Sequence, residues 1–173
     1  MVIDDASCSS GHRALPLPSV EQDVVDGNRI KGGDPALFLY RKTASGVEEL
    51  QSGDAVSERD LIQIKYQSGS HRYGVILSID GRNAITIHLP EDGQSAVELE
   101  RGRADTLGFA YELDDAPGGE RFYFVSSDVP FKVESVRNAV KSIAFNGGNR
   151  KLELPDTYAQ YVFTLAKDSN NAN

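Results

Sequence analysis

The chain has 173 residues, 39% of them hydrophobic and 25% charged, a composition typical of one soluble globular domain with a sizeable core. Its formal net charge of −8 disfavours nucleic acid or an anionic membrane surface as a partner, because both attract proteins through Lys and Arg. The single cysteine, Cys8, excludes an internal disulfide and a thiolate zinc cluster.

The first 28 residues are expected to form a flexible arm or linker. Pro16 and Pro18 interrupt them, and their apolar residues follow no sustained period. The stretch is not a signal peptide, and nowhere in the chain do the ~18 consecutive apolar residues of a membrane span occur. Taken as it stands, the chain is therefore cytoplasmic, although a domain trimmed from a longer protein has the same kind of start.

A single folded domain is expected over residues 29–166. Its first strand, residues 36–42, begins apolar on both faces, which is typical of a strand in a β-sandwich rather than in a single open sheet. Residues 47–50 predict a short partner strand. Residues 60–90 then predict three antiparallel strands, because apolar and polar side chains alternate and glycine-containing turns separate the runs.

Further strands are expected in the second half of the chain. Alternating or aromatic-rich runs mark residues 96–99, 107–113, 120–126 and 158–165, and strands at this spacing are typical of a sandwich or barrel. The sequence thus predicts a mainly β protein. We expect an antiparallel β-sandwich, Ig-like or jelly-roll-like, of about eight or nine strands, followed by a disordered tail over residues 167–173.

One helix is predicted among the strands, over about residues 131–145. Asp128 is placed as its cap, and Pro130 suits its first turn. Valines recur after it at three- and four-residue steps and give one apolar stripe. Gly147 and Gly148 are expected to end the helix.

No catalytic residue is predicted. The only histidines are His12, His71 and His88, and all three are expected on the surface: in the arm, in a hairpin turn and on the outward face of a strand. They lack the His-x-His or HExxH spacing of a metal site, and no G-x-S-x-G presents a serine nucleophile. We therefore expect neither an enzyme nor a bound metal or cofactor.

One acidic loop supplies the candidate binding residues. Glu112, Asp114, Asp115 and Glu120 surround a short Ala-Pro-Gly-Gly turn, and crowded carboxylates can hold a hard cation such as calcium. The spacing of a known calcium loop is absent, and the sequence is also a natural turn in which Arg121 offsets part of the charge. The turn is the favoured interpretation, with Asp114, Asp115 and Glu120 kept as candidates.

Basic and aromatic residues also gather near the ends of the predicted strands. Such mixtures can bind nucleic acid or sugar polymers. The favoured interpretation is that the tyrosine rings lie in the core with their hydroxyls exposed to solvent, while Lys and Arg at strand edges prevent pairing with other chains. The residues concerned are Tyr40, Arg41, Lys42, Lys65, Tyr66, Arg72 and Tyr73.

Three segments together resemble an uncharacterised bacterial β-rich domain. They are DAVSERDLIQIKY (54–66), YGVILSIDGRNAITIHLP (73–90) and ERFYFVSSDVPF (120–131), the last followed by the predicted helix. In that family the domain lies C-terminal to caspase-like peptidases, or in the extracytoplasmic part of anti-sigma-factor-like membrane proteins. The resemblance covers about residues 29–143, and its motifs are turns and core strands.

The resemblance implies a non-catalytic accessory domain that senses or docks, periplasmic or otherwise extracytoplasmic. Its partner would be another protein or an envelope component, with membrane attachment only through a segment outside this chain. Two alternatives stay open. One is a carbohydrate- or metal-dependent hydrolase on the same sandwich, using Asp114, Asp115, Glu120 and His88. The other is a structural spacer.

Overall fold

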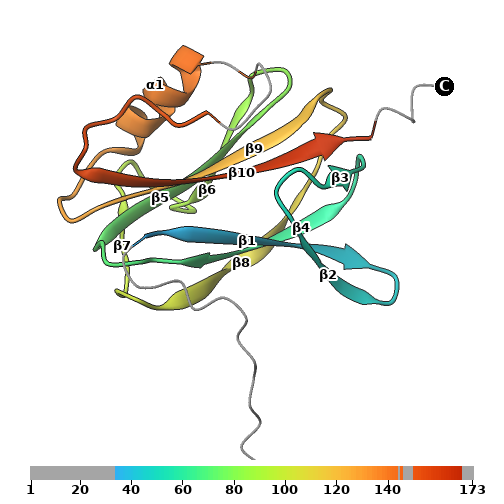
Figure 1. The fold of residues 1–173 in the computed structure, drawn as a ribbon, viewed down its shortest axis with the longest axis horizontal. Helices are drawn as coiled ribbons and strands as arrows, with labels where there is room; N and C mark the ends of the chain where they lie inside the picture. The colour runs from blue at the N-terminus through green and yellow to red at the C-terminus, as the bar shows by residue number, and fades with distance from the viewer. Residues whose placement is uncertain (1–33, 144, 146–149, 169–173) are drawn as a thin grey trace, which may run out of the picture.

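Two β-sheets packed face to face form the body of the protein (Figure 1). The computed structural model describes residues 34–143, 145 and 150–168. This part holds ten strands and one helix, so the predicted antiparallel β-sandwich is confirmed, with slightly more strands than expected. The predicted arm, residues 1–28, and nearly all of the predicted tail lie outside the described residues.

The lower layer in Figure 1, sheet A, has four antiparallel strands in the order β2-β1-β4-β8. The runs that alternate apolar and polar side chains form these strands, as predicted. Their bounds are Ala36–Thr43 for β1, Gly46–Leu50 for β2, Leu61–Gln67 for β4 and Ala104–Glu112 for β8.

The upper layer, sheet B, has the order β3-β10-β9-β5-β6, and the short β7 pairs with the start of β5. All its pairs are antiparallel except β3 with β10. The sequence did not predict β3, because two residues are too short a run to show alternation. The bounds are Ala55–Val56 for β3, Tyr73–Asp80 for β5, Ile85–Leu89 for β6, Val97–Glu98 for β7, Gly119–Ser127 for β9 and Tyr158–Lys167 for β10.

Each face of sheet B is buried. Its inner face packs against sheet A: Ile76, Phe122, Phe124 and Phe163 of sheet B meet Leu37, Leu39, Ile62 and Ile64 of sheet A. Its outer face is covered by helix α1, Val133–Ile143, whose valines pack on Val75, Leu77, Ile79, Tyr123 and Val125. This double coverage explains why all nine residues of β9 are buried.

Helix α1 begins at Val133, two residues later than predicted, and Asp128 is not its cap. The backbone before the helix is already engaged: the Ala96 N–H donates to Phe131 O at 2.9 Å, and the Val133 N–H donates to Gln94 O at 3.0 Å. The Phe131 carbonyl, which a helix beginning at residue 131 would use to accept from residue 135, is thus already engaged. Asp128 instead pairs with Arg101. The predicted stop at Gly147-Gly148 lies outside the described residues.

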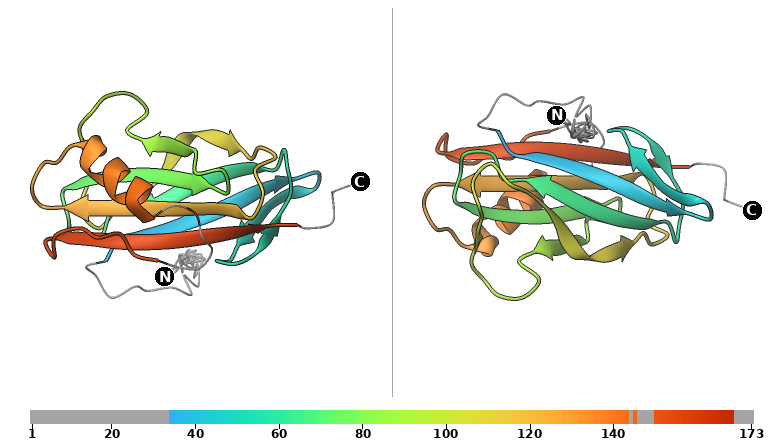
Figure 2. Two further views of the ribbon diagram at one scale, coloured as in Figure 1. Left: turned by 90° about the horizontal axis from the view of Figure 1, so that it is seen from above. Right: turned by 90° about the horizontal axis from the view of Figure 1, so that it is seen from below.

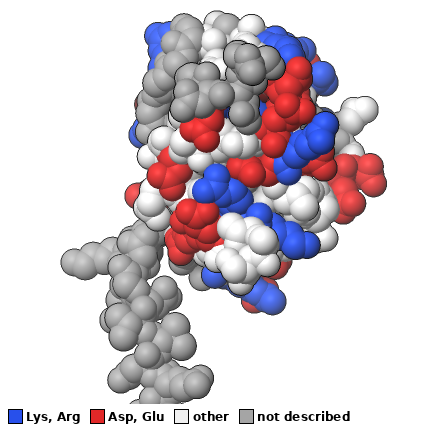
Figure 3. Space-filling view, turned by 90° about the vertical axis from the view of Figure 1, so that its right-hand side faces the viewer, with Lys and Arg blue, Asp and Glu red and all other residues white. Residues whose placement is uncertain are grey.

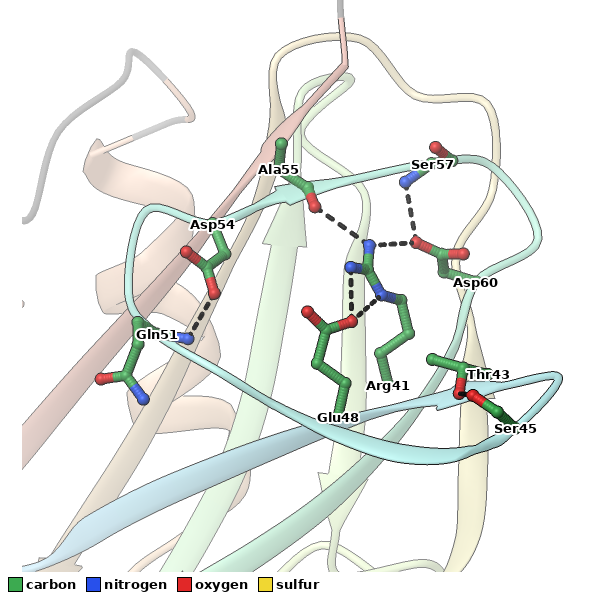
Figure 4. A network of polar contacts seen from close by, with 9 residues as sticks. All are labelled: Arg41, Thr43, Ser45, Glu48, Gln51, Asp54, Ala55, Ser57 and Asp60. Carbon is green, nitrogen blue, oxygen red and sulfur yellow. Dashed lines mark hydrogen bonds and ion pairs between the residues drawn. The ribbon is translucent and has the colours of Figure 1, made fainter.

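Acidic and basic side chains lie side by side at the end of the sandwich that carries β2 and β3 (Figure 3). Arg41 is central to a network there, shown in Figure 4. Its guanidinium donates to Glu48 on β2 at 2.7 Å, to Asp60 at 3.2 Å and to the Ala55 carbonyl of β3 at 3.1 Å. Because β2 lies in sheet A and β3 in sheet B, Arg41 links the two layers where the core ends.

We expect Arg41→Met to lower the free energy of unfolding by about 1–2 kcal/mol, since three partners lose a charge-assisted donor. The matched control is Arg72→Met, which breaks the exposed pair with Glu98 and should lower the free energy of unfolding much less. Urea unfolding of both variants measures the difference. Equal losses would contradict a linking role for Arg41.

Candidate functional site

The three acidic candidates from the sequence do not come together. Asp114 accepts a hydrogen bond from the Ala116 N–H at 2.8 Å, as in a turn, and Asp115 pairs with Arg82 at 2.6 Å. Glu120 is not in the loop at all but in β9, where it is only 3% exposed. No cluster of three potential metal ligands exists within the described part of the chain. The turn interpretation fits Asp114 and Asp115, whereas Glu120 belongs to the strand predicted over residues 120–126 and not to the acidic loop.

His88 was expected on the outward face of its strand, and this was wrong: the residue is 0% exposed. The register between β5 and β6 shifts at this point, so that Ile76 faces Leu89 while Leu77 faces Ile87. The bulge does not decide the side on which His88 lies: Ile85 and Ile87 pack on the outer face under α1, so alternation turns Thr86 and His88 to the inner face. The imidazole therefore points into the sandwich, with its ring 4.8 Å from that of Tyr111 on sheet A.

The other expectations for this region also need revision. His71 lies next to β5 and is half-buried, with Nδ1 2.9 Å from Ser126 Oγ, and His12 lies outside the described residues.

Arg121 does not offset the acidic loop. It is fully buried on the other face of sheet B from Glu120, because neighbouring residues of a strand point to opposite faces. There it stacks near Phe145, with its guanidinium carbon 5.2 Å from the ring centroid.

A buried cluster of polar side chains lies between the two sheets, within the otherwise apolar core. Ser78 on β5 donates to Glu120 Oε1 at 2.5 Å, and its Oγ lies 2.8 Å from His88 Nε2. A hydroxyl has one proton, so His88 Nε2–H is the donor in the second contact. Tyr111 on sheet A donates to Glu120, so the cluster joins the two sheets. We call Ser78, His88, Tyr111 and Glu120 the interior cluster.

Burial controls the protonation of the interior cluster. Removal from water raises the pKa of Glu120 from 4.5 to about 7, although hydrogen bonds from Ser78 and Tyr111 act in the opposite direction. Burial lowers the pKa of His88 from 6.5 to about 4 and raises that of Tyr111, where the nearby Glu120 carboxylate adds to the effect. His88 is thus neutral at ordinary pH, and Glu120 exchanges its proton near neutrality.

The interior cluster does not have the arrangement of a hydrolytic triad. In a triad the imidazole accepts the serine proton on one nitrogen and bonds a carboxylate through the other. Here the carboxylate binds the serine directly, and His88 Nδ1 has no hydrogen-bond partner among the described residues. Ser78 and His88 are both 0% exposed, so a substrate has no path to them in this conformation. The cluster is best explained as a polar contact between the sheets.

A groove on the outer face of sheet A is the candidate binding site. This face is turned toward the viewer on the right of Figure 2, and no element of the described chain covers it. The groove has a volume of about 630 Å³ and a mostly apolar exposed surface. All four strands contribute to its lining, which consists of Tyr40, Lys42 and Thr43 (β1), Gly46 and Val47 (β2), Leu61, Gln63 and Lys65 (β4), and Thr106 and Ala110 (β8).

The floor of the groove follows from the strand register. Tyr40, Gln63 and Ala110 lie side by side across β1, β4 and β8. The Gln63 amide donates to the Leu107 carbonyl at 2.6 Å and to the Phe109 carbonyl at 3.2 Å, where the β4–β8 register is irregular. Gln63 is thereby held against β8, and Ala110 adds only a methyl group. The side chains in the middle of this sheet face therefore project less than those around them, which forms the floor of the groove.

The rim of the groove is apolar on one side and cationic at its ends. Val47 on β2 is 70% exposed, which is unusual for a large hydrophobic residue. Lys42 and Lys65 line the groove, whereas no carboxylate does. Neither lysine takes part in an ion pair with any residue that the structure describes. Lys65 lies over the Phe38 ring, 5.9 Å from its centroid, which keeps it on this face.

Three members of the basic and aromatic set from the sequence, Tyr40, Lys42 and Lys65, do meet at this groove. The others are elsewhere: Tyr66 packs edge-on against Phe124, and Arg72 pairs with Glu98. The signal that could have identified the groove was the first strand, apolar on both faces. Its outward side chains belong to an open face rather than to a second buried layer.

Comparisons of the chain with models of known protein families, with curated proteins and with solved structures found no match. Within the described residues, no helix combines the length and the apolar character needed to cross a bilayer.

Proposed function

We propose that this chain is a non-catalytic docking module that binds a segment of another protein in the groove on sheet A. The observation that carries the proposal is the contrast between the two outer faces. Helix α1 covers the face of sheet B, whereas the face of sheet A exposes an apolar groove bordered by Lys42 and Lys65, which form no ion pair with a described residue. A groove of this size is within the range of about 300–1,000 Å³ typical of ligand sites.

A binding role is better supported than the hydrolase alternative. That alternative needs Asp114, Asp115, Glu120 and His88 to converge in a cleft. Asp114 and Asp115 belong to a turn, whereas Glu120 and His88 are enclosed between the sheets. Among the described residues that line the groove, in contrast, none is a histidine, a serine or a carboxylate that could act as an acid, base or nucleophile.

The proposal extends to the setting of the domain. The resemblance of residues 29–143 to the β-rich domain of anti-sigma-factor-like and caspase-like proteins supports an accessory, sensing role outside the cytoplasm. Such a domain would act in a longer or membrane-anchored assembly, and its uncovered sheet face would meet the partner.

The test compares two tryptophan substitutions on opposite faces. Ala110→Trp fills the groove from an exposed position of β8, and Asn138→Trp places the same ring on the exposed side of α1. Proteins captured from bacterial envelope extract by the immobilised chain are then identified by mass spectrometry. The proposal expects a defined partner that is retained by Asn138→Trp and lost with Ala110→Trp. An identical set of captured proteins for both variants and the unmodified chain would refute it.

A further inference from the structure

We infer that the groove takes an extended acidic segment with two carboxylates four residues apart and an apolar side chain between them. This inference rests on the proposed docking function and specifies the chemistry of its partner. It follows from the charge, the spacing and the shape of the groove.

The charge of the groove is opposite to that of the chain. The protein carries a net charge of −8, yet the described residues lining the groove contribute two lysines and no acid. The exposed Glu49 and Glu112 lie on the same face beside Tyr40 and Leu61 and flank the groove. The ion pairs between described residues use other cations, so both ammonium groups keep their charge available for a partner. Carboxylates on a partner would be attracted here, whereas a basic partner would be repelled from the groove itself.

The spacing follows from the register of β1 and β4. Arg41 is paired with Ile62, so the next residue, Lys42, lies opposite Leu61. Lys65 is four residues further along β4 and one strand to the side. At about 3.3 Å per residue and 4.8 Å between strands, the two lysine Cα atoms are about 14 Å apart. An extended peptide covers about 13 Å in four residues, so acidic residues at positions i and i+4 match the two lysines.

The shape of the groove specifies the residue between the acids. Tyr40, Gln63 and Ala110 form the row between the two lysines, and this row is low and mostly apolar. The side chain at position i+2 of the partner points at it. An aliphatic or aromatic group there would bury apolar surface of the Tyr40 ring and of the exposed Val47, whereas a polar group would leave that surface in contact with water.

A long polyanion fits less well than a protein segment. Nucleic acids and anionic glycans carry a charge at every repeat, and their binding depends on many cationic contacts. The groove supplies two lysines within a chain of net charge −8. A segment with two carboxylates matches that number without bringing further negative charge against the rest of the surface.

The experiment measures binding of fluorescein-labelled peptides to the full chain by anisotropy at low and moderate salt. The lead peptide is GSDTLTESG, and three others change one property each: GSKTLTKSG reverses the charges, GSDLTESG shortens the spacing and GSDTSTESG removes the apolar group. Binding of the lead peptide should be strongest and should weaken with salt. Each of the other three peptides should bind at least roughly tenfold more weakly, the ratio that corresponds to 1.4 kcal/mol.

Variants of the protein locate the site. Lys42→Glu with Lys65→Glu should abolish binding of the lead peptide, whereas Lys132→Glu with Lys141→Glu, near and on α1, makes the same change in net charge and should not. Lys42→Gln with Lys65→Gln provides a milder second variant should the double reversal fail to fold, and it should weaken binding at least roughly tenfold.

Two results separate this inference from the docking function. Equal binding of the acidic and basic peptides, or binding of no peptide while Ala110→Trp still removes the captured partner, would overturn the acidic segment and leave the docking function intact. Loss of both the peptide binding and the sensitivity of capture to Ala110→Trp would remove the two proposals together.

Discussion

Raising the pH from 4.5 to 8 is expected to destabilise the unmodified chain relative to the Glu120→Gln variant. The difference in the free energy of unfolding between the two proteins should change by about 3 kcal/mol in favour of the variant. Glu120 lies between the sheets, where burial raises its pKa from 4.5 to about 7. Below pH 4.5 the carboxyl is protonated in the folded and unfolded chains alike and has no effect. Between pH 4.5 and 7 the folded chain keeps a proton that the unfolded chain has released, so stability falls as the pH rises.

Above pH 7 the folded chain must hold the ionised carboxylate in the interior, and the full loss of stability is reached. A difference of 2.5 pKa units between 4.5 and about 7 corresponds to about 3 kcal/mol. Glutamine keeps the acceptor for the Ser78 hydroxyl and carries no charge, so its stability lacks this pH dependence. The neighbouring His88, whose pKa is lowered to about 4, acts in the opposite direction between pH 4 and 6.5. Its effect is common to both proteins.

Urea unfolding of both proteins from pH 4.5 to pH 8 measures the difference. The matched control is Glu112→Gln, at an exposed carboxylate of β8. Parallel stability curves for Glu120→Gln and the unmodified chain would show that Glu120 ionises normally, and the interior cluster would then need another explanation.

Gly119→Ala is expected to lower the free energy of unfolding by at least about 3 kcal/mol. Gly119 begins β9 with φ of 118°, a backbone conformation that residues with a side chain rarely adopt. A Cβ atom would also lie 2.0 Å from the Leu165 carbonyl oxygen on β10, and backbone of a central strand cannot move aside as a side chain can. Both effects act at the β9–β10 pair, which is in the middle of sheet B.

Thermal unfolding followed by circular dichroism checks this expectation. Gly108→Ala is the matched control: it lies in β8, its φ is not positive, and a Cβ there meets nothing within 4 Å. It should change stability by no more than about 0.5 kcal/mol. A similar melting temperature for both variants would contradict the steric argument at Gly119.

Alternation of side chains was sufficient to predict most of the sandwich. The runs of β4, β5 and β8 have an apolar residue at every second position, and the face predicted for Val75, Leu77 and Ile79 is the one that packs under α1. What alternation could not indicate is the assignment of strands to sheets. β4 and β5 are consecutive in the chain, yet they belong to different layers, because pairing depends on partners distant in sequence.

The interior cluster and the groove were missed for different reasons. Alternation correctly places His88 opposite to Ile85 and Ile87, but it could not show that α1 covers the isoleucine face, which leaves the His88 face between the sheets. Glu120 is the first residue of the predicted strand 120–126, but its place beside an acidic turn gives no sign that its side chain is enclosed between the sheets. The groove needs four strands in register, and the sequence holds only their separate contributions, such as Tyr40 on β1 and Ala110 on β8.

The position of β10 constrains how the molecule is made. This strand comes last along the described chain, yet it lies inside sheet B between β3 and β9. A nascent chain that has emerged only as far as α1 has the aromatic strand β9 with one edge unpaired. Such an edge is open to pairing with other chains until β10 has been synthesised and has paired with it. We therefore expect sheet B to close only once Tyr158–Lys167 is available to pair with β9.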